Sequence, residues 1–162
     1  MSPSPVTESM KYFLKAEKFA VIGRTMNDRS RWDNKILRWY QQRNFPVTAV
    51  RPNKPSEEVE GLSLLTEATQ IPDLPSTSIS IIINPLVGIG ILKSLYPTPP
   101  DPNREPRSIW FQPGADSAEI WEYVKQRGLE DRVIGKGACV YRDGDGILDL
   151  IKDGEKEGKG KL

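Results

Sequence analysis

Apolar residues along the chain form short continuous runs, separated by longer segments in which they recur at helical spacing. Continuous runs bounded by glycine or proline are typical of strands buried on both faces of a parallel sheet, and they cover residues 19–22, 46–50, 78–83, 108–111 and 132–134. Apolar positions three and four residues apart predict helices over residues 30–40, 86–96 and 117–126. This alternation predicts an α/β fold with a doubly wound, mostly parallel sheet of about five strands and helices on both faces.

The first two predicted helices begin at capping motifs. Ser30, followed by Asp33 three positions later, predicts a capping box. Asn84 is expected as the N-cap of the next helix, with Pro85 at its first position. The face of the first helix that we expect to be buried carries Trp32, Ile36, Leu37 and Tyr40. Trp39 lies outside this face, and we therefore expect it to be free to contact a partner.

The composition divides the chain into one domain and two ends. Residues 1–7 are rich in serine and proline and are expected to be flexible. Residues 152–162 carry charge and glycine with little to bury, which predicts a disordered tail. Residues 8–151 then form a single domain. Within it, residues 97–107 contain five prolines, which excludes a helix or a central strand and predicts a stiff surface loop.

The composition also excludes several classes of function. A net charge of +1 provides no overall electrostatic field that would attract nucleic acid or a membrane surface. No apolar run approaches the roughly 20 residues of a membrane span. The chain has no histidine, which excludes Ser-His-Asp hydrolysis, phosphohistidine chemistry and most zinc catalysis. A single cysteine and the absence of a secretory signal favour an intracellular compartment, the cytoplasm or the mitochondrial matrix.

We expect neither a catalytic residue nor a metal site. Cys139 is the one possible thiol nucleophile, and it lacks an imidazole partner to activate it. Asp143 and Asp145 suggest a calcium loop, but the later ligand positions are Ile147 and Gly154. The segment around these two aspartates is therefore predicted to be a turn.

Cations gather after the predicted strands, at the edge where open α/β sheets bind their ligands. Arg24, Arg29 and Arg31 surround the entry to the first helix. Arginine forks and the amides of a helix N-terminus suit a pyrophosphate, and a solvated basic loop is the alternative.

Two features of NAD sites that the sequence lacks indicate which class of nucleotide it would bind. The Gly-x-Gly-x-x-Gly fingerprint of Rossmann dinucleotide sites is absent, because only Gly23 is glycine in that turn, and no acidic residue follows the second strand. Arg51 and Lys54 stand there instead. They suit a ribose that carries an extra phosphate, as in NADP or in the 3′-phosphate of coenzyme A.

Six segments, in order along residues 17–142, resemble the coenzyme A-binding domain family of small Rossmann-type proteins. This family is related to the N-terminal domain of the succinyl-CoA synthetase alpha subunit. The segments are FAVIGRT (19–25), KILRWYQQRNFPVTAVRPN (35–53), EGLSLL (60–65), SISIIINP (78–85), IWFQPGA (109–115) and VIGKGACV (133–140). The resemblance implies a Rossmann-like fold and coenzyme A as the ligand.

The resemblance also implies a binding site spread over the strand ends. The turn at 23–25 would face the phosphates, 52–54 the adenosine end, 84–85 the floor of the crevice, and 112–114 the pantetheine; Cys139 falls where the family often has a cysteine. The expected cofactor-binding residues are Gly23, Arg24, Thr25, Arg29, Lys35, Arg51, Pro52, Asn53, Lys54, Asn84, Pro85, Gln112, Pro113 and Gly114.

Two places depart from the family pattern. Arg24 and Thr25 stand where a pair of small residues is usual, and Arg51 stands where the family has an asparagine. Both changes add positive charge, which either helps to bind phosphate or obstructs the site.

Together these observations predict a stand-alone domain that binds coenzyme A or an acyl-CoA without catalysis of its own. The alternatives are an NADP-dependent oxidoreductase, an acyl-CoA ligase subunit whose partner supplies the chemistry, and an interaction scaffold that has lost ligand binding. The expected partners are a small nucleotide cofactor and either a second copy of the chain or a partner enzyme, with no nucleic acid and no membrane.

Overall fold

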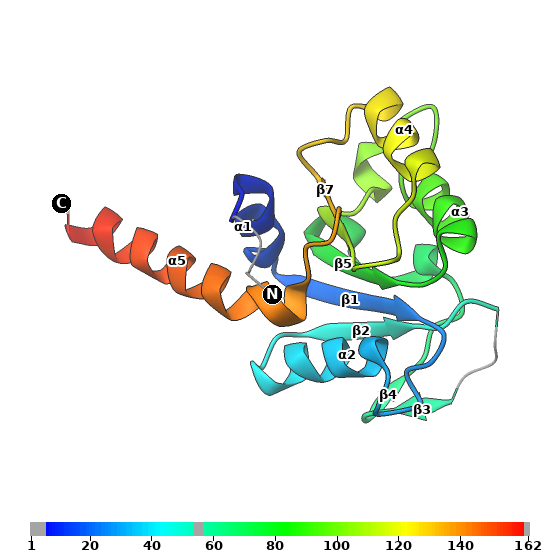
Figure 1. Ribbon diagram of the computed structural model, residues 1–162, viewed down its shortest axis with the longest axis horizontal. Coiled ribbons are helices and arrows are strands. Elements are labelled where there is room, and N and C mark those ends of the chain that lie inside the picture. The colour runs from blue at the N-terminus through cyan, green and yellow to red at the C-terminus, as the bar shows by residue number, and fades with distance from the viewer. Residues whose placement is uncertain (1–5, 54–56, 161–162) are drawn as a thin grey trace.

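The core of the molecule is a parallel sheet, and Figure 1 shows it with helices on both sides. The computed structural model describes residues 6–53 and 57–160. The five strands lie in the order β2-β1-β5-β6-β7. Their bounds are β1 Lys18–Gly23, β2 Val47–Val50, β5 Thr77–Ile82, β6 Ser108–Phe111 and β7 Val133–Ile134. The predicted α/β class, parallel sheet and strand number are confirmed.

The register aligns the carboxyl ends of the strands at one edge of the sheet. Ile22 pairs with Val50 on one side and with Ile81 on the other, and Ile81 pairs with Phe111. The strand order reverses at β1, since β2 lies on one side of it and β5 on the other. The edge beyond Gly23 is therefore the switch point at which doubly wound sheets bind ligands.

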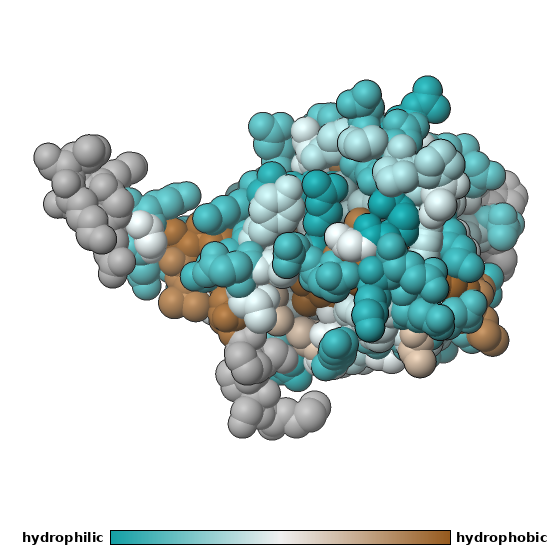
Figure 2. All heavy atoms as spheres, turned by 90° about the horizontal axis from the view of Figure 1, so that it is seen from above, coloured by the Kyte–Doolittle hydropathy of each residue, from teal (hydrophilic) through white to brown (hydrophobic). Residues whose placement is uncertain are grey.

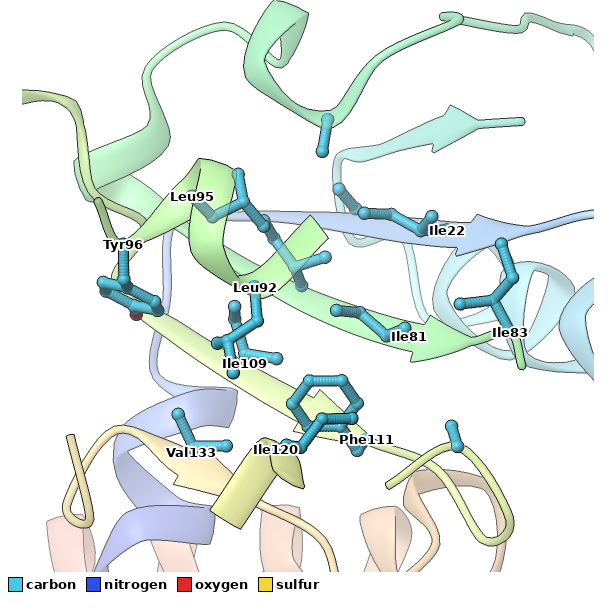
Figure 3. Close-up of a cluster of buried hydrophobic side chains, with 14 of the residues drawn as sticks. Ile22, Ile81, Ile83, Leu92, Leu95, Tyr96, Ile109, Phe111, Ile120 and Val133 are labelled. Carbon is cyan, nitrogen blue, oxygen red and sulfur yellow. The ribbon is translucent and has the colours of Figure 1, made fainter. Parts of the chain in front are cut away.

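Two layers of helices bury the two faces of the sheet. Helices α3 (Pro85–Leu95) and α4 (Ala118–Arg127) cover one face, and Figure 3 shows part of the cluster there, with Ile22, Ile81 and Phe111 of the sheet facing Leu92 and Ile120. Helices α1 (Glu8–Leu14), α2 (Trp32–Gln42) and α5 (Val140–Gly160) cover the other face. Successive strand residues alternate between the two clusters, as the pleat requires.

Short elements complete the fold. Strands β3 (Glu58–Val59) and β4 (Leu62–Ser63) pair antiparallel in a separate two-stranded ladder. Three single-turn helices are η1 (Ala68–Gln70), η2 (Leu74–Ser76) and η3 (Pro102–Arg104). The last lies in the proline-rich surface loop, which a buried ion pair ties to α4: Glu105 Oε2 lies 2.9 Å from Arg127 Nη2.

The carboxyl-terminal segment differs most from its prediction. Residues 152–162 were expected to be a disordered tail and the segment around Asp143 a turn, yet α5 runs from Val140 to Gly160. Its first half packs on the domain through Val140 and Ile147, and Arg43 of α2 binds Asp145 at 2.6 Å and 2.8 Å. This packing stabilises the first half of the helix.

Beyond its packed half, α5 projects from the body of the molecule (Figure 1). Figure 2 shows an apolar surface on this part of the helix, where Leu150 is exposed and Leu148 and Ile151 are half-buried, followed by exposed charged residues. Within the part of the chain that the structure describes, no helix is both long and apolar enough to cross a membrane.

Helix α2 begins differently from its prediction. Its N-cap is Arg31, which makes no side-chain capping hydrogen bond. The expected capping box is wrong, because the Ser30 hydroxyl donates a hydrogen bond to Asp28 and the Asp33 carboxylate accepts one from Thr25 N. The burial of Trp32 and Trp39 is also the reverse of the prediction. Trp32 is 55% exposed, whereas Trp39 is buried at 2% because α5 covers it with Gly144. The next cap is confirmed, since the Asn84 side chain accepts a hydrogen bond from Leu86 N at 2.9 Å.

Candidate functional site

Most of the predicted site residues lie at the carboxyl edge of the sheet. Gly23 ends β1, residues 51–53 follow β2, Asn84 and Pro85 connect β5 to α3, and residues 112–114 follow β6. Arg29 lies in the β1–α2 connection and Lys35 in the first turn of α2. Lys54 lies outside the described residues.

The turn after β1 encloses the carboxylate of Asp33, which is 1% exposed. Asp33 Oδ2 accepts a hydrogen bond from Thr25 N at 2.7 Å, and both carboxylate oxygens lie 2.9 Å from Thr25 Oγ1. Asp33 Oδ1 also accepts from Asn34 N at 2.8 Å. A side chain at Gly23 would collide with this carboxylate. An internal anion therefore fills the turn in which a doubly wound fold holds a pyrophosphate.

The donors that remain near this turn belong to cationic side chains rather than to the backbone. Arg24 is exposed and forms no ion pair within residues 6–53 and 57–160. Arg29 is exposed and lies 3.3 Å from Glu60. Lys35 is half-buried with its ammonium 4.6 Å from the centre of the Trp32 ring. Arg24 and Lys35 are available at the edge, whereas Arg29 is paired with Glu60, and the Thr25 donors and the Asn34 amide already have an acceptor.

The end of β2 offers less open charge than the sequence suggested. Arg51 is 6% exposed, and its Nη1 lies 3.4 Å from Glu57 Oε2. Asn53 is exposed, has a positive φ of 62° and donates its backbone N–H to Thr66 O at 3.2 Å. The charge of Arg51 is thus shared with a carboxylate of the protein, and an approaching phosphate would meet Asn53 at the surface.

An apolar cavity of about 290 Å³ lies at the ends of β5 and β6, between α2 and the start of α5. It is lined by Trp32, Ile36, Ile82, Gln112, Pro113, Cys139 and Arg142. Gln112 and Pro113 are the predicted site residues in this wall. Trp32 was instead expected in the core, and Cys139 was noted as a possible nucleophile and as a cysteine position of the family, but not as a predicted site residue. The position of Cys139 after a strand end could have indicated that it lines the cavity. The contribution of the other lining residues depends on how α2 and α5 pack.

Gln112 is held in one orientation at the cavity wall. Its Oε1 accepts a hydrogen bond from Val140 N at 2.9 Å, and the residue is 1% exposed. Its Nε2 has no hydrogen-bond partner among residues 6–53 and 57–160. A buried donor without an acceptor destabilises a protein, and such groups in native structures are few. This amide is therefore a candidate ligand contact.

Aromatic and charged side chains stand at the mouth of the cavity. Trp32 and Tyr141 meet edge to face, with ring centres 5.5 Å apart, and they are 55% and 45% exposed. Arg142 Nη2 lies 2.9 Å from Asp143 Oδ2, which also accepts a hydrogen bond from Cys139 N at 3.2 Å. The mouth thus combines exposed apolar surface with a positive charge.

A larger hollow of about 600 Å³ lies at the other end of the sheet, beside the proline-rich loop. Asp73, Asp101 and Arg104 border it, together with Leu74 and Leu95. It lies near the amino end of β5, away from the switch point, so the smaller cavity is the better ligand site. No group of three potential metal ligands (Cys, Asp or Glu) occurs within the described ranges.

The doubly wound sheet, with its cavity at the switch point, defines a Rossmann-type nucleotide-binding domain. Residues 17–143 match the model of the CoA binding domain family, and the chain belongs to that family. No curated protein sequence matches it.

Three solved structures are similar. A conserved hypothetical protein from Pyrococcus furiosus is 27% identical, with a TM-score of 0.62 over 77% of this chain and 97% of that one. A hypothetical protein from Pyrococcus horikoshii OT3 is 16% identical, with a TM-score of 0.68 over 91% and 99% of the two chains. A protein from Thermus thermophilus, titled cell-free ID.343, is 19% identical, with a TM-score of 0.66 over 84% and 93%. The last two comparisons show a shared fold.

Proposed function

We propose that this chain binds coenzyme A at the carboxyl edge of its sheet and performs no catalysis of its own. The observation that carries the proposal is the presence of two cations, exposed Arg24 and half-buried Lys35, at the same edge of the sheet as an apolar cavity, with Lys35 beside Trp32 of the cavity wall. Membership of the CoA binding domain family supports the choice of ligand. A long ligand that is anionic at one end and apolar at the other fits this arrangement.

In this proposal the ligand runs along the strand ends. Arg24, Arg29 and Lys35 hold the phosphates through charge-assisted hydrogen bonds from their side chains. The adenosine end lies toward residues 51–53. The pantetheine passes Asn84 and Pro85 and reaches residues 112–114, where the cavity begins.

The absence of catalysis is supported by the state of the chemical groups near the cavity. Cys139 has no imidazole to activate it, because the chain contains no histidine. Asp33 and Asp143 are buried and already accept hydrogen bonds from the protein. A second chain would have to supply any chemistry on the bound thiol or thioester.

NADP is the alternative ligand, and family membership favours coenzyme A over it. A dinucleotide in this fold places its pyrophosphate on the amides of the first turn and the first helix. In this chain, Asp33 takes the Thr25 amide and the Asn34 amide. The same amides are closed to the pyrophosphate of coenzyme A, which in this proposal lies across the cations at the rim.

Calorimetric titration tests the proposal. We expect one coenzyme A per chain, and binding of dephospho-coenzyme A weaker by about tenfold, as the loss of one charge-assisted hydrogen bond requires. Arg24→Ser should weaken coenzyme A by a similar factor. Arg104→Ser, an exposed arginine on the proline-rich loop, is the matched control and should have no effect. Tighter binding of NADP, or no heat from any nucleotide as for an interaction scaffold, would contradict the proposal.

A further inference from the structure

The cavity at the end of the proposed pantetheine path is lined mainly by apolar side chains. Trp32, Ile36, Ile82 and Pro113 form most of its wall. A free thiol at the end of pantetheine is small and would leave this volume of about 290 Å³ largely empty. An apolar group attached to the sulfur would fill it and remove apolar surface from water.

The mouth of the cavity adds a second, independent indication of an apolar ligand. Trp32 and Tyr141 leave much of their ring surface in water, at 55% and 45% exposure. Exposed apolar surface that gathers around a cavity marks a ligand-binding groove.

Gln112 places an unpaired polar group in the wall of the cavity. Its Oε1 is committed to Val140 N, so the side chain can offer only its Nε2 donor. That donor is buried and has no acceptor within the described ranges. A carbonyl oxygen beside the sulfur accepts such a hydrogen bond, whereas free coenzyme A has no carbonyl at this position.

We propose that the cavity holds the apolar acyl group of a coenzyme A thioester, with Gln112 Nε2 donating to the thioester carbonyl. The preferred ligand is then a short-chain acyl-CoA rather than coenzyme A itself. This inference rests on the proposed function, because the same site must bind the coenzyme.

A ligand series on the unmodified chain tests the inference. Each methylene group that the cavity buries should lower Kd about fourfold. Butyryl-CoA should therefore bind at least about tenfold more tightly than coenzyme A, and acetyl-CoA should fall between them. Equal dissociation constants across the series would overturn the acyl pocket while leaving coenzyme A binding intact. If none of these ligands binds, the proposed function itself has failed.

Two variants localise the effect. Ile82→Phe fills the cavity and should abolish the preference for butyryl-CoA over coenzyme A. Val47→Phe is the matched control, since Val47 is also a half-buried strand residue but lies at the amino end of its strand. A butyryl-CoA preference that survives in Ile82→Phe would overturn the assignment of the cavity.

Gln112→Glu keeps an acceptor for Val140 N and removes the Nε2 donor. It should weaken butyryl-CoA by about tenfold more than it weakens coenzyme A, as expected for loss of one buried hydrogen bond. Equal weakening of both ligands would contradict the proposed thioester contact. Because the ligand series needs no substitution, the proposal remains testable even if a variant fails to fold.

Discussion

Replacing Asp33 by alanine should destabilise the fold and open the turn after β1. The substitution removes the acceptor of Thr25 N, Thr25 Oγ1 and Asn34 N, which bind the carboxylate at 2.7–2.9 Å. It also removes a negative charge from the first turn of α2, where the helix dipole favours one. The backbone of Gly23, which approaches the carboxylate closely, would face a gap.

The size of the effect follows from these contacts. A hydrogen bond to a charged group contributes about 1.5–3 kcal/mol, and a negative charge in the first turn of a helix contributes about 0.3–1 kcal/mol. Thr25 is half-buried, so water can reach its released donors and recover part of the loss. We therefore expect a destabilisation of about 3 kcal/mol, or a fall in Tm of about 6–12 °C for a chain of this size.

Urea unfolding followed by circular dichroism measures this free energy. Glu119→Ala is the matched control, because Glu119 is an exposed acidic residue in the first turn of α4, and its loss should stay within about 0.5 kcal/mol. An Asp33→Ala chain as stable as the control would refute the structural role of the carboxylate. The freed amides should also bind inorganic phosphate, so phosphate should raise the Tm of Asp33→Ala and leave the Tm of the unmodified chain unchanged.

Gly144→Ala should destabilise the chain by about 1–3 kcal/mol, because the added Cβ would collide with the ring of Trp39. Gly146→Ala meets open space on the same helix and should stabilise by about 0.5–1 kcal/mol, so equal urea midpoints for the two variants would show that α5 does not pack as described. Burial raises the pKa of Tyr40 and of Tyr96 well above the ordinary value of about 10. Because the unfolded chain then loses these protons at a lower pH than the folded chain, stability should be complete below pH ~10 and fall as the pH rises above it. Tyrosinate absorbance that appears near pH 10 for all tyrosines, before unfolding, would contradict this burial.

The sheet could be predicted because each of its strands carries its own local signal. Runs such as 19–22 and 109–111 are apolar without interruption, and the turns that follow them contain glycine or proline. The cap at Asn84 was also predictable, since it needs only a side chain and an amide two residues away. These features depend on neighbours in the sequence.

The site depended on contacts between distant segments, which the sequence does not display. Asp33 has the spacing of a capping residue, but Thr25 draws its carboxylate into the turn after β1. Trp39 lies off the apolar stripe of α2 and is nevertheless buried, because Gly144 of α5 lets the two helices approach closely. The cavity wall combines α2, two strand ends and α5, so no single segment predicts it.

Native mass spectrometry of the chain with added nucleotides tests the central claim most directly. The account predicts an adduct with the mass of one coenzyme A per chain, partial loss of that adduct in Arg24→Ser, and no comparable adduct with NADP. A chain that stays free of adduct in excess coenzyme A, or that retains NADP instead, would contradict it.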